Sequence, residues 1–192
     1  MRNVITGLAM ATLSLAVATG AKADMSYQDI LSKYTDENSA GVAVIVKKGD
    51  KVLFHEAEGK ANIELDVSLD ENHIFRIGSI TKQFTAAAIL MLHEQGKLSI
   101  YDNIHKYVPD FPTEGNEVKL VHLLSHTSGI NNYTNNRETF TKRIQELVST
   151  DEMLALFAKE PMLFKTGEQY GYSNTGYVLL GKVIEKVSKQ SY

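Results

Sequence analysis

A serine and a lysine three residues apart are the first candidates for chemistry in this 192-residue sequence. Ser79 and Lys82 are the ends of a Ser-Ile-Thr-Lys tetrapeptide, at the start of an apolar stretch with helical spacing. Residues three apart share a helix face, so the amine can reach the hydroxyl. A serine becomes a nucleophile when a base takes its proton, and lysine can be that base if its surroundings lower its pKa. A plain helix cap also fits the pattern, because serine is a favoured N-cap residue.

A second group of polar residues occurs near the other end of the chain, in the tripeptide Tyr-Ser-Asn at 172–174. The phenol of Tyr172 can relay a proton if a nearby cation lowers its pKa. The amide of Asn174 can hold a substrate carbonyl and hydrogen-bond to a lysine. Taken alone, the tripeptide is equally well explained as a turn followed by a helix N-cap.

Amphipathic stretches with helical spacing would position both groups. They predict helices over residues 27–34, from Ser79 to about Gly96, and over 118–125. A capping box at 149–152 predicts another helix through Ala158. The predicted apolar face of the helix from Ser79 consists of Ile80, Phe84, Ala87, Ala88 and Met91. The predicted face of the last helix consists of Tyr177, Leu180, Ile184 and Val187.

Strand patterns occur only between the first of these helices and the others. Residues 42–46 and 52–54 are short apolar runs around a Lys-Gly-Asp turn, which predicts a β-hairpin. Residues 59–70 are polar and irregular. Strands followed by helices, without a visible linker, predict an α+β fold in one globular unit.

Other combinations of catalytic residue types are less complete. His126 and Ser128 could belong to a Ser-His-Asp triad, but the chain has no G-x-S-x-G elbow to present the serine. His122 and His126 are four apart, yet no glutamate follows His122, so the H-E-x-x-H zinc pattern fails. It also fails at His93, because Lys97 occupies the second histidine position. We interpret these histidines as structural or solvent-facing.

The composition narrows the class of protein. Hydrophobic residues make up 43% and charged residues 22%, with 13 glycines and 3 prolines, as in an ordinary folded domain. The net charge is −3 and no basic block occurs, which argues against a nucleic-acid partner. The chain has no cysteine, which excludes disulfides, thiolate metal sites and a cysteine nucleophile.

Residues 1–23 have the layout of a secretory signal peptide. Arg2 precedes an apolar stretch over 4–19, and Ala21 and Ala23 stand at −3 and −1 of a cut before Asp24. We therefore expect export to the periplasm or the medium, with no membrane contact after cleavage. An uncleaved membrane anchor is the alternative, because the apolar stretch is nearly long enough to span a bilayer.

Three segments in a fixed order make the chain similar to the beta-lactamase-related serine hydrolases. They are residues 75–82 (Phe-Arg-Ile-Gly-Ser-Ile-Thr-Lys), 123–130 (Leu-Leu-Ser-His-Thr-Ser-Gly-Ile) and 172–177 (Tyr-Ser-Asn-Thr-Gly-Tyr). The resemblance covers residues 38–192. This group contains class C beta-lactamases, D-alanyl-D-alanine carboxypeptidases, D-aminopeptidases and some esterases.

The resemblance implies a beta-lactamase/transpeptidase-like fold and an acyl-enzyme reaction on an amide, beta-lactam or ester. It makes Ser79 the acylated nucleophile and Lys82 its activating partner. Tyr172 would transfer protons, and Asn174 would contact the substrate and Lys82. The backbone amide of Ser79 would be one oxyanion-hole donor. The partner implied is a small-molecule or peptide substrate, with no metal or organic cofactor; the oligomeric state stays open.

The chain departs from the family pattern after Asn174. The family has a third motif there, a Lys- or His-containing triplet ending in Gly on a later strand, but this chain ends at Tyr192. Residues 165–167 spell Lys-Thr-Gly, but they precede Tyr172, so we interpret them as a turn. We therefore expect residues 24–192 to be a truncated hydrolase domain, with the C-terminal strands missing and no activity by itself. The alternatives are a non-catalytic protein that binds peptidoglycan-like ligands in the same cleft, and an incomplete gene product that does not fold stably.

Overall fold

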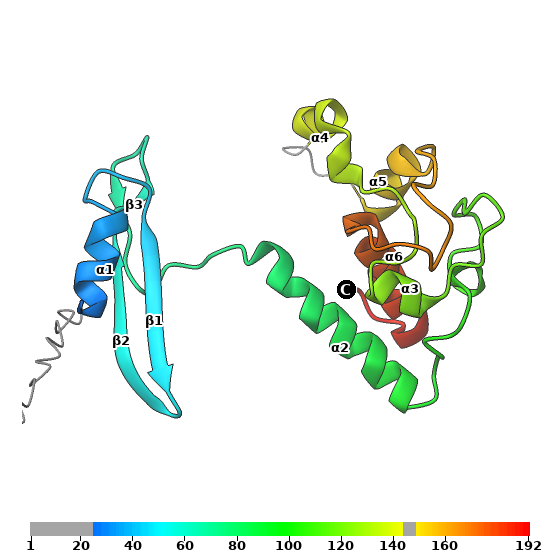
Figure 1. Ribbon diagram of the computed structural model, residues 1–192, viewed down its shortest axis with the longest axis horizontal. Coiled ribbons are helices and arrows are strands. Elements are labelled where there is room, and N and C mark those ends of the chain that lie inside the picture. The colour runs from blue at the N-terminus through cyan, green and yellow to red at the C-terminus, as the bar shows by residue number, and fades with distance from the viewer. Residues whose placement is uncertain (1–24, 144–148) are drawn as a thin grey trace, which may run out of the picture. The chain divides into compact units, whose positions relative to one another are not determined.

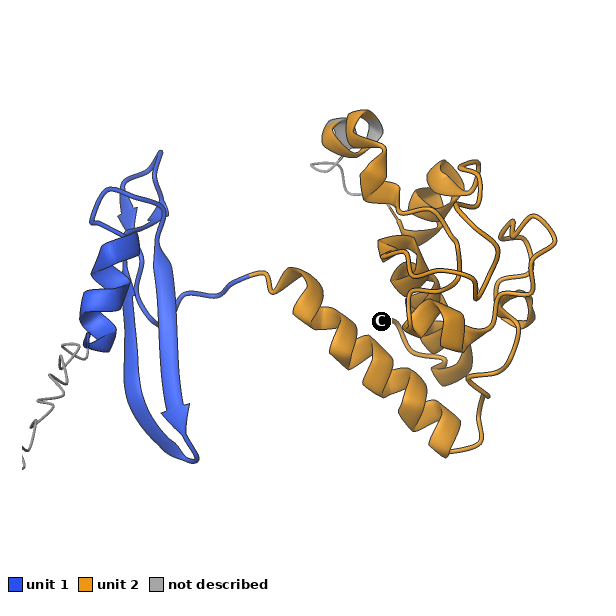
Figure 2. Ribbon diagram, in the orientation of Figure 1, with its two compact units in different colours: residues 1–75 blue, residues 76–192 orange. Residues whose placement is uncertain are grey.

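The computed structural model describes residues 25–143 and 149–192. The predicted signal peptide, residues 1–23, lies outside these described residues. No helix within the described ranges is long and apolar enough to cross a membrane. The chain divides into two compact units, of which the first ends at Phe75 and the second begins at Arg76 (Figure 2). The sequence predicted one globular unit, because no change of composition marks this boundary.

The first unit contains the predicted helix and hairpin. Helix α1 (Tyr27–Tyr34) begins with a capping box formed by Ser26 and Asp29. Strands β1 (Val42–Lys48) and β2 (Lys51–Glu58) pair antiparallel, with an irregularity after Val46. Helix α1 lies along the hairpin (Figure 1), where the ring of Tyr27 is 5.6 Å from that of Phe54. Both predicted elements are confirmed, and β2 extends four residues beyond its predicted end.

The segment over residues 59–70, expected to be irregular, contains a further short strand pair. Strand β3 (Lys60–Asn62) pairs antiparallel with β4 (Val67–Ser68). The ammonium of Lys60 lies 2.8 Å from a carboxylate oxygen of Asp66 across the turn. Strands this short have no alternation of apolar residues long enough to be recognised in a sequence.

The second unit is helical. Its elements are the 3₁₀ turn Gly78–Ile80, α2 (Thr81–Glu94), the 3₁₀ turn Ile104–Lys106, α3 (Leu120–Leu124), the 3₁₀ turn Tyr133–Asn135, α4 (Arg137–Arg143), α5 (Thr150–Phe157) and α6 (Asn174–Ser188). Helix α6 packs against α2, α3 and α5 (Figure 1). Fully buried side chains fill the space between them: Ile89, Ile104, Val118, Leu120, Leu123, Leu179, Leu180 and Val183. The core of this unit therefore lies around α6.

Two helix predictions need correction. The buried residues of α2 are Thr85, Ile89 and Leu92, whereas Phe84 and Met91 of the predicted face are 61% and 57% exposed. Apolar residues occur around most of this helix, so their spacing does not select one face. Helix α3 begins at Leu120, two residues later than predicted, because Lys119 is extended and bridges to Asn103.

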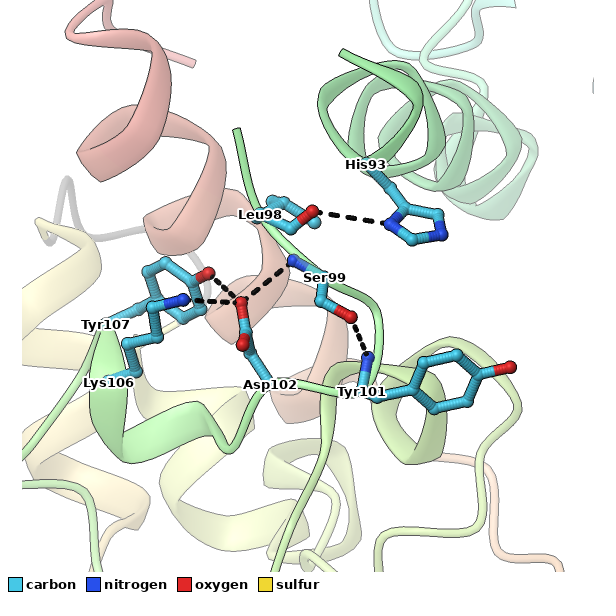
Figure 3. Close-up of polar contacts among 7 residues, drawn as sticks. All are labelled: His93, Leu98, Ser99, Tyr101, Asp102, Lys106 and Tyr107. Atoms are coloured by element: carbon cyan, nitrogen blue, oxygen red, sulfur yellow. Dashed lines mark hydrogen bonds and ion pairs between the residues drawn. The ribbon is translucent and has the colours of Figure 1, made fainter. Parts of the chain in front are cut away.

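Asp102 organises the loop between α2 and α3 (Figure 3). Its carboxylate accepts hydrogen bonds from the Ser99 amide at 2.8 Å, from the Lys106 ammonium at 2.8 Å and from the Tyr107 hydroxyl. Partial burial acts to raise the pKa of Asp102, but these hydrogen bonds outweigh it and lower the pKa from 3.8 to about 2. The backbone carbonyl of Asp102 also accepts from the amide of Leu120 at 3.1 Å, so the loop is tied to the start of α3.

Candidate active site

Ser79 and Lys82 lie where the chain enters α2. Ser79 is in the 3₁₀ turn that precedes the helix, and Lys82 is the second residue of α2. The ammonium nitrogen of Lys82 lies 3.3 Å from Ser79 Oγ, so the two side chains meet as their spacing predicts. The serine lies in the turn before the α-helix and not within it.

Tyr172 and Asn174 approach this pair from the start of α6. The hydroxyl oxygens of Ser79 and Tyr172 are 2.9 Å apart, and Lys82 Nζ donates to Asn174 Oδ1 at 2.7 Å. Ser173 is the N-cap of α6, and its Oγ accepts the amide of Gly176. The tripeptide thus combines a loop residue, a cap and the first residue of a helix. The structure brings all four predicted site residues together, while their roles stay predictions.

The site favours the ionised form of one phenol. Hydrogen bonding from Lys82 and from Ser79, with the charge of Lys82, lowers the pKa of Tyr172, although desolvation acts in the opposite direction. Lys82 Nζ also lies 4.9 Å from the centre of the Tyr172 ring and 5.3 Å from that of Tyr177. Ser79 therefore has two neighbours that could accept its proton, Tyr172 as a phenolate or Lys82 as a neutral amine, and a nucleophilic serine requires such a base.

One site residue was not identified from the sequence. Asn132 is buried, and its Oδ1 accepts from both the backbone amide and the side-chain Nδ2 of Asn174, each at 3.2 Å. Holding Nδ2 there turns the other atom of the amide, Oδ1, toward Lys82. No local signal distinguishes Asn132 from an ordinary loop asparagine.

The other candidates have structural surroundings. Ser128 is 1% exposed and its Oγ accepts the amide of Ile130, so a substrate cannot reach it as a triad would require. His122 Nδ1 accepts the amide of Lys119, and His126 Nδ1 accepts that of Ser173. Within the described ranges, no three histidine, aspartate or glutamate side chains are grouped so that they could hold a metal ion.

Residues 165–167 form the turn expected of them. The amide of Glu168 donates to the carbonyl of Lys165. Thr166 Oγ1 donates to the carbonyl of Ser128, and the amide of Gly167 donates to that of Thr127, each at 2.8 Å. These hydrogen bonds connect the loop at residues 165–167 to the loop at residues 127–128.

A cavity of about 500 Å³ in the second unit opens beside the site. Its lining includes Ser79, Lys82, Tyr133, Met153, Asn174 and Tyr177. The nucleophile candidate and the asparagine amide therefore border one space, as a substrate pocket requires.

A family model described as beta-lactamase matches residues 27–192. The chain belongs to the beta-lactamase family. A penicillin-binding protein of Bacillus subtilis (strain 168) is 31% identical over 171 residues, which are 86% of this chain and 36% of that relative. The octameric penicillin-binding protein homologue from Pyrococcus abyssi is 35% identical, with a TM-score of 0.70 over 86% of this chain and 39% of the other. A D-stereospecific amidohydrolase from Streptomyces sp. is 25% identical, with a TM-score of 0.69 over 85% and 50%.

These likenesses confirm the predicted resemblance to beta-lactamase-related serine hydrolases and the α+β, beta-lactamase/transpeptidase-like fold. The chain spans less than two thirds of each relative, from 36% to 50% of its length. The family match and these relatives thus support the broad class of hydrolase for this chain.

Proposed function

We propose that this protein is a serine hydrolase that forms an acyl-enzyme on Ser79 and acts on an amide, beta-lactam or ester of the beta-lactamase/DD-peptidase kind. The position of Ser79 Oγ, 2.9 Å from Tyr172 OH and 3.3 Å from Lys82 Nζ, carries the proposal. General-base groups at such distances can take the serine proton as the oxygen attacks a carbonyl.

The reaction has two stages in this proposal. Ser79 Oγ bonds to the substrate carbonyl carbon and its proton passes to Tyr172 or Lys82. The tetrahedral intermediate then collapses, the bond to the leaving group breaks, and the leaving group receives that proton. Water attacks the resulting ester and releases the acid and free Ser79. Asn174, hydrogen-bonded to Lys82 and bordering the cavity, would orient both lysine and substrate.

A covalent serine probe tests this proposal on the full-length gene product. A fluorophosphonate or penicillin probe should label the wild-type protein, and Ser79→Ala should abolish the labelling. Ser125→Ala is the matched control, because Ser125 is exposed and its hydroxyl donates to the carbonyl of Val121. Loss of labelling in Ser128→Ala with retention in Ser79→Ala would contradict the site. Reversible penicillin binding without a covalent adduct would identify a binding protein.

We also propose that residues 1–23 direct export. N-terminal sequencing of the protein recovered from the producing cells should begin at Asp24. A chain that keeps Met1 and stays in the membrane fraction would indicate an uncleaved anchor.

A further inference from the structure

His126 is packed against the phenol of Tyr172. The centres of the two rings are 4.5 Å apart, and their planes are 31° from parallel. The His126 ring is also 5.1 Å from the ring of Tyr177 and 5.9 Å from that of Tyr170. Close ring contacts of this kind, two tilted and one edge-on, restrict how an aromatic side chain can rotate.

The same histidine holds the backbone on both sides of Tyr172. Its carbonyl oxygen accepts the amide of Gly171 at 2.8 Å, and its Nδ1 accepts the amide of Ser173 at 3.2 Å. Gly171 and Ser173, which flank Tyr172, are thus both hydrogen-bonded to His126, the first to its backbone and the second to its side chain. Nδ1 can accept this bond only while it carries no proton.

The backbone of His126 is itself unusual. Its φ is +58°, in the left-handed region that non-glycine residues adopt infrequently. Such a strained conformation persists where the surrounding structure imposes it, often near functional sites. At His126 these surroundings include the contacts with residues 170–173.

We propose that His126 is a positioning residue: its imidazole, packed against the ring of Tyr172 and accepting the Ser173 amide, holds the Tyr172 hydroxyl within hydrogen-bonding distance of Ser79. This inference rests on the proposed function, in which Tyr172 moves protons. His126 is not assigned a proton transfer of its own.

The surroundings of His126 favour its neutral form. Burial first, and then the positive charge of Lys82, lowers its pKa. The titratable groups that face it are Lys82 from α2, Tyr170 and Tyr172 from the preceding loop, and Tyr177 from α6. Protonation at acid pH would place a hydrogen on Nδ1 opposite the Ser173 amide, and the hold on Tyr172 would be lost.

The test compares two variants of the full-length gene product, with ¹³Cζ-tyrosine NMR titration as a readout that needs no activity. His126→Ala removes ring and acceptor, so the pKa of Tyr172 should rise toward its ordinary value of about 10. The rate constant of Ser79 labelling by a fluorophosphonate should fall on the order of 10²-fold with unchanged probe affinity, as expected of a misplaced catalytic group. In His126→Asn, the asparagine tolerates the left-handed backbone and keeps an acceptor near the Nδ1 position. This variant should therefore recover part of the lowering of the Tyr172 pKa and part of the labelling rate.

His122 provides a matched control. It is also half-buried, accepts a backbone amide through Nδ1 at 3.1 Å, and has its pKa lowered by burial. His122→Ala should leave the Tyr172 pKa and the labelling rate unchanged. The wild-type labelling rate should also fall at acid pH, and the midpoint of this acid limb should match the pKa of His126 measured by NMR of its imidazole. The acid limb should be absent in His126→Asn.

An unchanged Tyr172 pKa in folded His126→Ala would overturn the inference, as would an identical acid limb in folded His126→Asn. If the wild type is never labelled but its Tyr172 pKa is low and depends on His126, the proposed function fails while the positioning role stands. If His126→Ala does not fold, the acid limb in His126→Asn decides.

Discussion

The hydroxyl oxygens of Ser79 and Tyr172 lie 2.9 Å apart, although 93 positions separate the two residues in the sequence. They meet because α2, which follows Ser79, packs against α6, which follows Tyr172. Ile89 of α2 and Leu180 of α6 are fully buried members of the same core. Burial of apolar side chains thus fixes the distance on which the proposed chemistry depends.

Tyr172→Phe keeps the ring but removes the proton carrier. Acylation of Ser79 should fall by about 10²–10⁴-fold, the usual contribution of general acid–base catalysis, while the melting temperature changes little. Because the pKa of Tyr172 is lowered, the wild-type rate should rise with pH through a value below 10, and this rise should be absent in the variant. Stopped-flow labelling from pH 5 to 10 measures both effects. Equal rates in the two proteins across neutral pH would remove Tyr172 from the mechanism.

Two substitutions of Lys82 separate its base role from its charge. Lys82→Ala should remove nearly all acylation, by about 10²–10⁴-fold. Lys82→Arg keeps a positive charge, but arginine does not give up its proton in proteins, so it cannot replace a base. Both variants should therefore be slow in the labelling assay. Recovery of wild-type labelling in Lys82→Arg would show that only the charge is needed.

Gly129→Ala should destabilise the loop that carries His126. A Cβ at Gly129 would lie 2.1 Å from the carbonyl oxygen of Phe164, at a φ of +80°. Gly115 has nearly the same φ, +79°, but open space around it, so Gly115→Ala has only the backbone strain of about 1–3 kcal/mol. Urea denaturation should show a larger loss of unfolding free energy for Gly129→Ala. Equal losses of unfolding free energy in the two variants would mean that the loop of Gly129 can move away from Phe164 at no energetic cost.

Asp102→Asn should lower stability at neutral pH, because the carboxylate accepts hydrogen bonds from Lys106 and Tyr107. A loss of about 1.5–3 kcal/mol is expected for hydrogen bonds to a charged group. The folded pKa of about 2 is below the unfolded value of 3.8, so this stabilisation is present above pH 3.8 and is lost as pH falls through 2.

Denaturation at a series of pH values measures this difference, with the exposed Asp110→Asn as control. The difference between wild type and Asp102→Asn should shrink as pH falls from 4 toward 2. A difference that does not change with pH would show that the charge of Asp102 contributes nothing.

Local features of the fold were accessible from the sequence. The spacing of Ser79 and Lys82 predicted their meeting, because three residues are nearly one helical turn. The capping box at Ser149 and Glu152 predicted the start of α5, and Ser149 Oγ does accept the amide of Glu152 at 3.2 Å. These signals act within one turn of the chain, so no distant partner was needed to interpret them.

The sequence by itself thus determined the capped start of α5, the hairpin and the residue types of the site. The tertiary structure decided which side of α2 is buried, because an apolar residue is compatible with several faces until a partner helix covers one. It also decided the places of Asn132 and His126, whose partners Asn174 and Tyr172 are more than 40 positions away. A hydrogen-bond acceptor carries no local mark of its donor, and only packing of the helices around α6 brings these pairs into contact.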